Sequence, residues 1–377
     1  MREEVGGQGK APTAASPAPW RRWLLLPFHC AAVLSSAKSF RDNAIIGSPA
    51  LNRRGLHILR RRVAALLGDR RRRRLRGLLT AEDQAAFERD GFVLKPDFLY
   101  EATFRAFRDE VMTLSAPARE AVIGDTLTRL IPLDEAALRR LPTVRAVLDG
   151  PDYRGLLAYA GSFRRRPHLY VQTVFSQFCD GPPDIQSFYH SDTFHPTVKA
   201  WLYLQDVEED AAPLAYVPGS HRANRRRLAW ERKVSLGARQ AGDRLTAEGS
   251  LRFSEAEIHR LGYGPPRKLS VAANTLVVAD TSGIHRRSPT QHQTVRVSIW
   301  AYSRSNPFLP WPGGDLARLP LVKNRVLRAY WAVTDRWKDA RRVRRDWGWV
   351  GQRSPLTPPG LSKDRVAHEE QRFRGDA

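Results

Sequence analysis

The stretch Thr294-Val-Arg-Val-Ser-Ile-Trp-Ala-Tyr302 alternates between small or branched apolar residues and polar, charged or aromatic residues. Alternate residues of a β-strand point to opposite faces, so a period of two predicts a strand here. One face would carry Val295, Val297, Ile299 and Ala301, and the other Arg296, Ser298, Trp300 and Tyr302. A buried arginine is costly unless its guanidinium meets an anion, so Arg296 is expected either to bind an anionic ligand or to form an internal salt bridge.

Five more β-rich runs precede this strand, separated by turns containing Gly, Pro, Asp and Asn. They are Leu169 to Ser176, Thr197 to Val207, Pro213 to Val217, Lys268 to Val271 and Thr275 to Ala279. A helical segment, Ser254 to Leu261, is inserted among them. Short strands with this punctuation indicate an antiparallel barrel or double-sheet roll, and not a doubly wound parallel sheet.

Helical patterns dominate the chain before these strands. Thr80-Ala-Glu-Asp83 is typical of a helix N-terminus, and the turn Asp90-Gly91 leads from that helix into a short strand. Further helical patterns around 101–114, 134–147 and 151–160 carry the chain to residue 161. Upstream, the apolar residues from Leu51 to Leu67 have helical spacing among arginines, and this helix is expected to end at Gly68, before the run Arg70 to Arg74.

The net charge of +23 is distributed unevenly. Residues 1–80 hold 17 Lys/Arg against 4 Asp/Glu, residues 81–320 hold 31 against 28, and residues 321–377 hold 14 against 7. We expect a basic N-terminal extension (1–79), partly disordered with an amphipathic helix, a near-neutral folded domain (80–320) and a basic helical C-terminal tail (321–377). The basic helix is expected to present a solvated face or to contact anionic lipid. No aromatic residues interleave with its arginines as a base-stacking surface needs, so nucleic-acid binding is not expected.

The cysteine count and the hydropathy pattern exclude other classes of protein. Two cysteines, Cys30 and Cys179, are too few for a disulfide scaffold or a Cys-based zinc site, which favours a reducing, cytoplasmic setting. No apolar run reaches the roughly 18–20 residues of a transmembrane helix. The nearest candidate, Trp23 to Ala37, contains Pro27 and His29 and lacks a clear signal-peptide cleavage site.

The segment His190-Ser191-Asp192 follows one β-like run and precedes another. In a strand, His190 and Asp192 would project from the same face, where an imidazole and a carboxylate can bind one metal ion. His285, which follows the run Thr275 to Ala279, is the natural third ligand. Two histidines and one carboxylate on one side of an ion form the facial triad of non-haem Fe(II) oxygenases.

Several motifs together resemble the phytanoyl-CoA dioxygenase family of Fe(II)/2-oxoglutarate oxygenases. They are Asp90-Gly-Phe-Val, His190-Ser-Asp192, Lys199-Ala-Trp-Leu-Tyr-Leu, Asp206-Val, Pro213-Leu-Ala-Tyr-Val-Pro-Gly-Ser-His221, and His285 followed by Arg296. The resemblance covers roughly residues 80–305 and implies a mainly β fold with flanking helices (α+β), built around a double-stranded β-helix (jelly roll, cupin-like) core.

The resemblance also implies an activity. His190, Asp192 and His285 would be the catalytic Fe(2+) ligands, Arg296 would hold the distal carboxylate of 2-oxoglutarate, and Trp201 would border this co-substrate. With O2 as the second co-substrate, 2-oxoglutarate would be decarboxylated to succinate and CO2 while a C–H bond of a small organic or acyl substrate is hydroxylated. Related halogenases lack the carboxylate ligand, so Asp192 favours hydroxylation over chlorination.

The chain departs from the family pattern at two places. Ala211-Ala212 stands where a glycine usually precedes the proline of the Pro-Gly-Ser-His segment, and Ser176 and Gln177 stand where some members have a lysine near the co-substrate. His221 is expected to fix its turn by hydrogen bonding. Arg164 to Arg166 and Arg225 to Arg227 are expected to form a solvated surface, or else to attract an anionic small-molecule substrate.

Two functions of other classes stay open. The first is a non-catalytic, cupin-like binding protein that uses the same pocket without turnover. The second is a basic membrane-surface adaptor that makes peripheral membrane contact through the N-terminal region.

Overall fold

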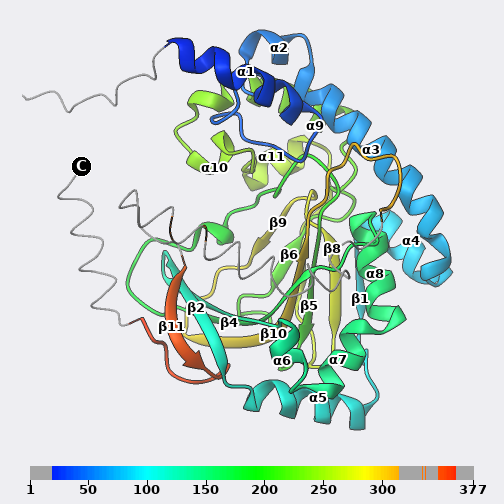
Figure 1. Cartoon of the computed structure of the whole chain (residues 1–377), viewed down its shortest axis with the longest axis vertical. Coiled ribbons are helices and arrows are strands. Elements are labelled where there is room, and N and C mark those ends of the chain that lie inside the picture. The colour runs from blue at the N-terminus through cyan, green and yellow to red at the C-terminus, as the bar shows by residue number, and fades with distance from the viewer. Residues whose placement is uncertain (1–18, 314–332, 334–335, 337–346, 362–377) are drawn as a thin grey trace, which may run out of the picture.

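The computed structural model describes residues 19–313, 333, 336 and 347–361, and its centre is a pair of antiparallel sheets (Figure 1). The large sheet has the strand order β1-β8-β5-β10-β4-β3-β2-β11, and the small sheet has the order β7-β6-β9. The large sheet contains β1 (Phe92–Lys95), β2 (Ala116–Ile123), β3 (Thr126–Pro132), β4 (His168–Ser176), β5 (Val198–Tyr203), β8 (Leu276–Asp280), β10 (Thr294–Ser303) and β11 (Gly348–Arg353). The small sheet contains β6 (Leu214–Tyr216), β7 (Arg267–Leu269) and β9 (His285–Arg287).

The six β runs predicted from the sequence form β4, β5, β6, β7, β8 and β10. Every pairing between described strands is antiparallel. The predicted fold class is therefore confirmed: the protein is mainly antiparallel β with flanking helices, in the two-sheet arrangement of a double-stranded β-helix.

The helices before and between the strands lie around this core (Figure 1). They are α1 (Pro19–Val33), α2 (Pro49–Arg53), α3 (Leu56–Leu75), α4 (Ala81–Asp90), α5 (Glu101–Thr113), α6 (Glu135–Leu138), α7 (Pro142–Asp149), α8 (Pro151–Gly161), α9 (Arg225–Gly237), α10 (Arg244–Ala247) and α11 (Glu255–Arg260). The predicted N-cap of α4 is confirmed, because the Thr80 hydroxyl accepts a hydrogen bond from the amide of Asp83. Gly91 ends the same helix at a φ of 86°, a conformation that glycine adopts without strain.

Strand β10 separates two apolar clusters, as its alternation predicts. Val297, Ile299 and Ala301 are fully buried in a cluster shared with α5, α7 and α8, which cover the outer face of the large sheet. Trp300 contacts a second cluster, which lies between the two sheets and includes Trp201 from β5 and Tyr216 from β6. The face of β10 that carries Arg296 is therefore the inner face.

Between the predicted helical patterns 101–114 and 134–147, where no strand is predicted, residues 116–132 form the hairpin of β2 and β3. Helix-favouring residues such as Ala118, Glu120 and Ala121 obscure the strand pattern in this segment. Cross-strand burial overrides their propensity: Glu120 and Arg129 are opposite each other in the register and form a fully buried ion pair of 2.7 Å.

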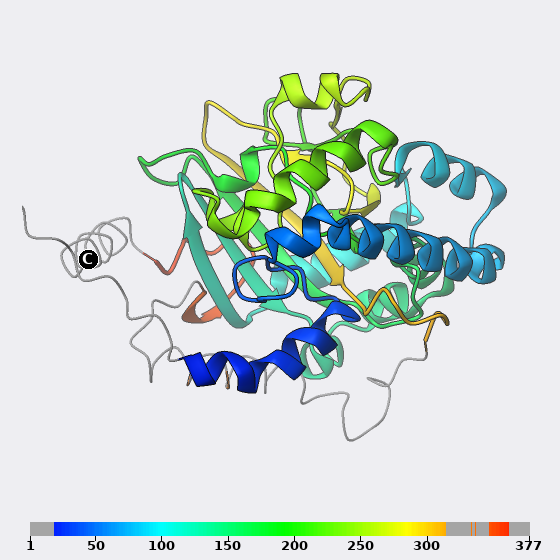
Figure 2. The same ribbon diagram turned by 90° about the horizontal axis from the view of Figure 1, so that it is seen from above.

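Helix α3 does not end at Gly68, contrary to the prediction, but continues through the arginine run to Leu75. A β-carbon at position 68 would lie 2.9 Å from Cγ of Pro196, so glycine allows the helix to pass close to this loop. Arg60, Arg61 and Arg71 are buried against the rest of the protein. Figure 2 shows α3 running beside α9, where Glu231 contacts both His57 and Arg61 of α3.

The chain ends lie largely outside the described residues. The disordered tail predicted for residues 1–20 falls mainly on residues 1–18, and most of the helical tail predicted for 321–377 falls on 321–346 and 362–377, where only residues 333 and 336 are described. Residues 348–353 of this predicted tail form the strand β11 of the large sheet, paired with β2. Among the described residues, none of the helices has the length and hydropathy needed to cross a membrane.

Candidate metal centre

A backbone bridge joins the two predicted histidine ligands, which are distant in sequence. The amide of His190 donates to the carbonyl of His285, and the amide of His285 donates to the carbonyl of His190, both at 2.9 Å. This pairing places the centroids of the two imidazole rings 4.4 Å apart. The pairing of residue 190 with the first residue of β9 therefore brings the two histidines together.

Asp192 completes the cluster. Its Oδ1 lies 3.7 Å from Nε2 of His190, and its Oδ2 lies 3.9 Å from Nε2 of His285. One ligand atom from each of the three residues lies within 4.8 Å of the others. In place of the expected strand, His190 forms isolated bridges to Arg252 and to His285. A bend follows at Asp192, whose amide donates to the carbonyl of Thr281 at 2.9 Å.

Hydrogen bonds orient both rings with Nε2 toward the carboxylate. Nδ1 of His190 lies 2.8 Å from the carbonyl of Phe188, and Nδ1 of His285 lies 3.1 Å from the carbonyl of Gly283. A carbonyl can only accept, so Nδ1 carries the proton in each neutral ring and Nε2 presents a lone pair. Nε2 of His190 is buried without a hydrogen-bond partner. Two such nitrogens and a carboxylate are a donor set that suits Fe(II).

The electrostatics keep these donors in the protonation states that bind a metal. Burial lowers the pKa of His285 to about 4 and, with the neighbouring His285, lowers that of His190 well below its ordinary value. Burial opposes ionisation of Asp192, but the Lys199 ammonium and the two histidines outweigh it and lower the pKa of the carboxyl group. Both imidazoles are thus neutral and the carboxylate is charged near neutral pH.

Two lysines that were not predicted as site residues contact Asp192. Nζ of Lys199, on β5, lies 2.7 Å from Oδ2, and Nζ of Lys38 donates to the Asp192 carbonyl at 2.6 Å. Strand alternation could have identified Lys199, which shares a strand face with Trp201. No local signal identifies Lys38, which is separated from Asp192 by 154 positions in the chain.

Arg296 is buried on β10, and one of its guanidinium nitrogens donates to the carbonyl of Ala212. Within the described residues no carboxylate forms an ion pair with Arg296, so the internal salt bridge that was the alternative prediction is not formed there. The Nε of Arg296 has no hydrogen-bond partner. Burial lowers the pKa of Arg296 to about 10, so the side chain remains charged at neutral pH. A buried, uncompensated guanidinium fits a carboxylate ligand.

Trp201 and Arg296 both lie near the aromatic residues between the sheets. Trp201 shares a cluster with Tyr203 and Tyr216. The Arg296 guanidinium carbon lies 5.9 Å from the Tyr203 ring centroid, and the Tyr216 ring stacks on His285 with centroids 6.3 Å apart. These contacts connect the surroundings of Trp201 and Arg296 to the metal-ligand cluster.

A known protein family matches part of this chain. The family model described as phytanoyl-CoA dioxygenase (PhyH) matches residues 87–246. The match covers 160 of the 377 residues. This match confirms the resemblance found in the sequence and supports an enzyme of the oxygenase type. A search of curated proteins found no match.

Three solved structures illustrate what the chain is similar to. The epimerase SnoN from nogalamycin biosynthesis is 17% identical, with a TM-score of 0.36 over 59% of this chain and 80% of that chain. The carbocyclase SnoK from the same biosynthesis is 20% identical, with a TM-score of 0.38 over 59% and 83%. HygX from Streptomyces hygroscopicus, solved with nickel and 2-oxoglutarate bound, is 16% identical, with a TM-score of 0.36 over 59% and 86%.

Proposed function

We propose that this protein is an Fe(II)/2-oxoglutarate-dependent dioxygenase that hydroxylates a C–H bond of a small organic or acyl substrate. The observation that carries the proposal is the convergence of His190, Asp192 and His285, with all three ligand atoms within 4.8 Å. The match of residues 87–246 to the phytanoyl-CoA dioxygenase family model supports it.

Each residue has a role in this proposal. His190, Asp192 and His285 would hold Fe(II), Arg296 would bind the distal carboxylate of 2-oxoglutarate, and Trp201 would border the co-substrate. When bound, iron and 2-oxoglutarate supply the oxidising power, with O2 consumed and succinate and CO2 released. The protein contributes neutral imidazoles, a fixed carboxylate and a buried guanidinium, all set before the ligands arrive.

The charge of Asp192 favours hydroxylation over halogen transfer. A halide needs the coordination position that a carboxylate otherwise fills, and Asp192 is held in its charged form by Lys199 at 2.7 Å. Lys38 and Lys199 also bring two cations to this site, which is consistent with an anionic small-molecule substrate.

The test is a turnover assay on the full chain loaded with Fe(II) without oxygen, then supplied with 2-oxoglutarate, O2 and a panel of small organic acids and acyl esters. Succinate release that a panel compound stimulates is the expected result, and the His285→Ala variant is the matched control. Metal and 2-oxoglutarate binding without any succinate would instead favour the non-catalytic binding protein.

A further inference from the structure

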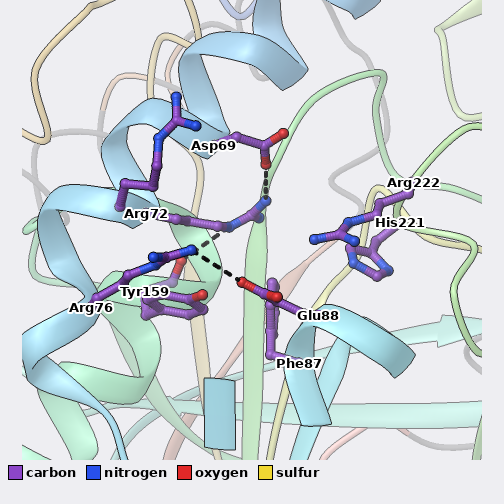
Figure 3. A pocket seen from close by; sticks show the side chains of 9 residues that line it. Asp69, Arg72, Arg76, Phe87, Glu88, Tyr159, His221 and Arg222 are labelled. Atoms are coloured by element: carbon purple, nitrogen blue, oxygen red, sulfur yellow. Dashed lines mark hydrogen bonds and ion pairs between the residues drawn. The ribbon is translucent and has the colours of Figure 1, made fainter. Parts of the chain in front are cut away.

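A pocket of about 240 Å³ lies where α3, α4 and α8 meet the loop after β6 (Figure 3). Its lining includes four arginines, Arg72, Arg73, Arg76 and Arg222, together with His221 and Phe87. We call it the arginine pocket. None of these residues belongs to the candidate metal centre, so the inference below does not depend on the proposed function.

The arginine pocket has an excess of positive charge. Its four arginines face two carboxylates of the lining, Asp69 and Glu88, and Arg72 also pairs with Asp280, so one positive charge has no counter-charge. The ion pairs are long: Arg72 lies 3.6 Å from Asp69, and Arg76 lies 3.9 Å from Glu88. Arg76 directly follows the last residue of α3, so it lies about one helical turn beyond Arg72 on the same side.

Arg72 is fixed at the inner side of the pocket. Its guanidinium binds Asp280 at 2.7 Å, donates to the backbone carbonyls of Tyr159 and Ala160, and lies 4.8 Å from the centroid of the Phe87 ring. Such a network immobilises the side chain before any ligand binds. Ordering entropy that is already lost in the free protein does not weaken binding.

Two other side chains of the lining have unused hydrogen-bonding capacity. Arg222 points toward the α3 arginines across the pocket (Figure 3), and no ion pair or side-chain hydrogen bond of Arg222 occurs within the described part of the chain. Both ring nitrogens of His221 are buried without a hydrogen-bond partner.

The expectation that His221 fixes its turn by hydrogen bonding is therefore wrong. Ser220 does so instead, because its hydroxyl accepts from the Ile284 amide at 2.7 Å.

The basic run of α3 is divided by the fold, which disfavours a flat lipid-binding surface. Arg71 is completely buried and donates to Ser162 and to the carbonyls of Pro307 and Leu309. Arg72 is held by Asp280, as described above. A concave group of guanidiniums selects a compact anion, whereas a membrane surface requires cations on an exposed face.

We propose that the arginine pocket binds a phosphate group, either as inorganic phosphate or as part of a small phosphate ester. Guanidinium groups bind phosphate oxygens through pairs of parallel hydrogen bonds, which distinguishes phosphate from spherical anions. The pocket is smaller than the roughly 300–1,000 Å³ of typical small-molecule sites, so it accommodates a phosphate group with little else attached.

The experiment is calorimetric titration of the full chain with inorganic phosphate and, separately, with glycerol phosphate. The test variant is Arg76→Gln combined with Arg222→Gln. The matched control is Arg62→Gln combined with Arg70→Gln, which removes the same charge from exposed positions outside the pocket. We expect the test variant to weaken binding about tenfold or more, and the control to bind like the wild type.

The outcomes separate the ligand sources and can overturn the proposal. Tighter binding of inorganic phosphate indicates the free ion, and tighter binding of glycerol phosphate indicates an ester; both support the site. Absence of binding by the wild type to either probe, or equal weakening in the two double variants, overturns it. Thermal unfolding of both variants is measured alongside, and the altered residues are exposed, so folding is expected to be retained.

Discussion

At the scale of single residues, the candidate metal centre depends on two imidazoles whose tautomers are fixed by backbone carbonyls. The Nδ1 contacts to Phe188 and Gly283 leave no freedom to exchange the roles of the two ring nitrogens. In each histidine, Nε2 therefore already presents its lone pair to the cluster before a metal binds.

Replacing either histidine is expected to remove metal binding. His190→Ala or His285→Ala deletes one of three ligand atoms, and the remaining pair no longer forms a facial set. Titration with Fe(II) under nitrogen, or with Ni(II) as a stable substitute, measures the loss, which should exceed about 100-fold in affinity. Normal metal binding and succinate release in either variant would rule out the assignment of the triad.

Arg296 provides a separate prediction about the co-substrate. Arg296→Ala removes a charge-assisted pair with a carboxylate, which is worth about 1.5–3 kcal/mol, or roughly 10- to 150-fold in affinity. The 2-oxoglutarate concentration for half-maximal succinate formation should rise by this factor. Arg296→Lys, which keeps the charge but not the planar fork, should lie between the wild type and Arg296→Ala. An unchanged 2-oxoglutarate requirement in Arg296→Ala would exclude the proposed contact.

At the scale of elements, a buried charge network joins α3 to α9. Glu231 of α9 is fully buried and contacts His57 at 3.1 Å and Arg61 at 3.3 Å, both from α3, as well as Arg227 at 2.8 Å. Helix α3 lies within the predicted extension of residues 1–79, but these contacts make it part of the folded unit. The division of the chain at residue 80 remains a prediction.

Glu231→Ala is expected to destabilise the protein by about 3–5 kcal/mol, because it leaves buried guanidiniums without a counter-charge. Glu248→Ala is the control: Glu248 also lies four positions after its arginine, but the Arg244–Glu248 pair is partly exposed and should contribute only about 0–1 kcal/mol. Urea unfolding of both variants measures the difference. Equal effects would show that the α3–α9 network contributes no more than a surface pair.

At the scale of the whole molecule, several buried histidines are neutral in the folded state and make its stability depend on pH. Burial lowers the pKa of His195 to about 3 and that of His285 to about 4, and it also lowers those of His190 and His221. In the unfolded chain these groups titrate near 6.5, so below about pH 6.5 the unfolded state binds more protons than the folded state. Their contribution to stability is complete above about pH 6.5 and is lost as the pH falls toward these folded-state values.

His195→Gln tests this linkage without altering a proposed metal ligand. Each such histidine contributes about 1.4 kcal/mol per pH unit to the slope of the unfolding free energy between about pH 6.5 and pH 4. The variant should show a slope smaller by about that amount when urea unfolding is followed in the presence of a chelator. His259→Gln, at an exposed position, is the control. A slope identical to that of the wild type in His195→Gln would contradict the prediction.

The sequence alone determined the features that repeat locally along the chain. The alternation in β10 predicted its buried outer face and the inward position of Arg296, and His190, Asp192 and His285 were identifiable by chemistry and resemblance. Local periodicity records which side of an element is buried, and side-chain chemistry determines which ligands it can offer. These two kinds of information indicated an antiparallel barrel or double-sheet roll and the candidate ligands, and the family resemblance added the double-stranded β-helix.

Tertiary structure alone decided which distant residues meet. It brought Lys38 to Asp192, continued α3 past Gly68 where the helix passes close to Pro196, and paired β2 with β3 despite their helix-favouring residues. It also divided the arginine run between the interior and the arginine pocket. Such contacts depend on which distant segments the chain brings together and on the space between neighbouring elements. A local sequence pattern contains no information about either.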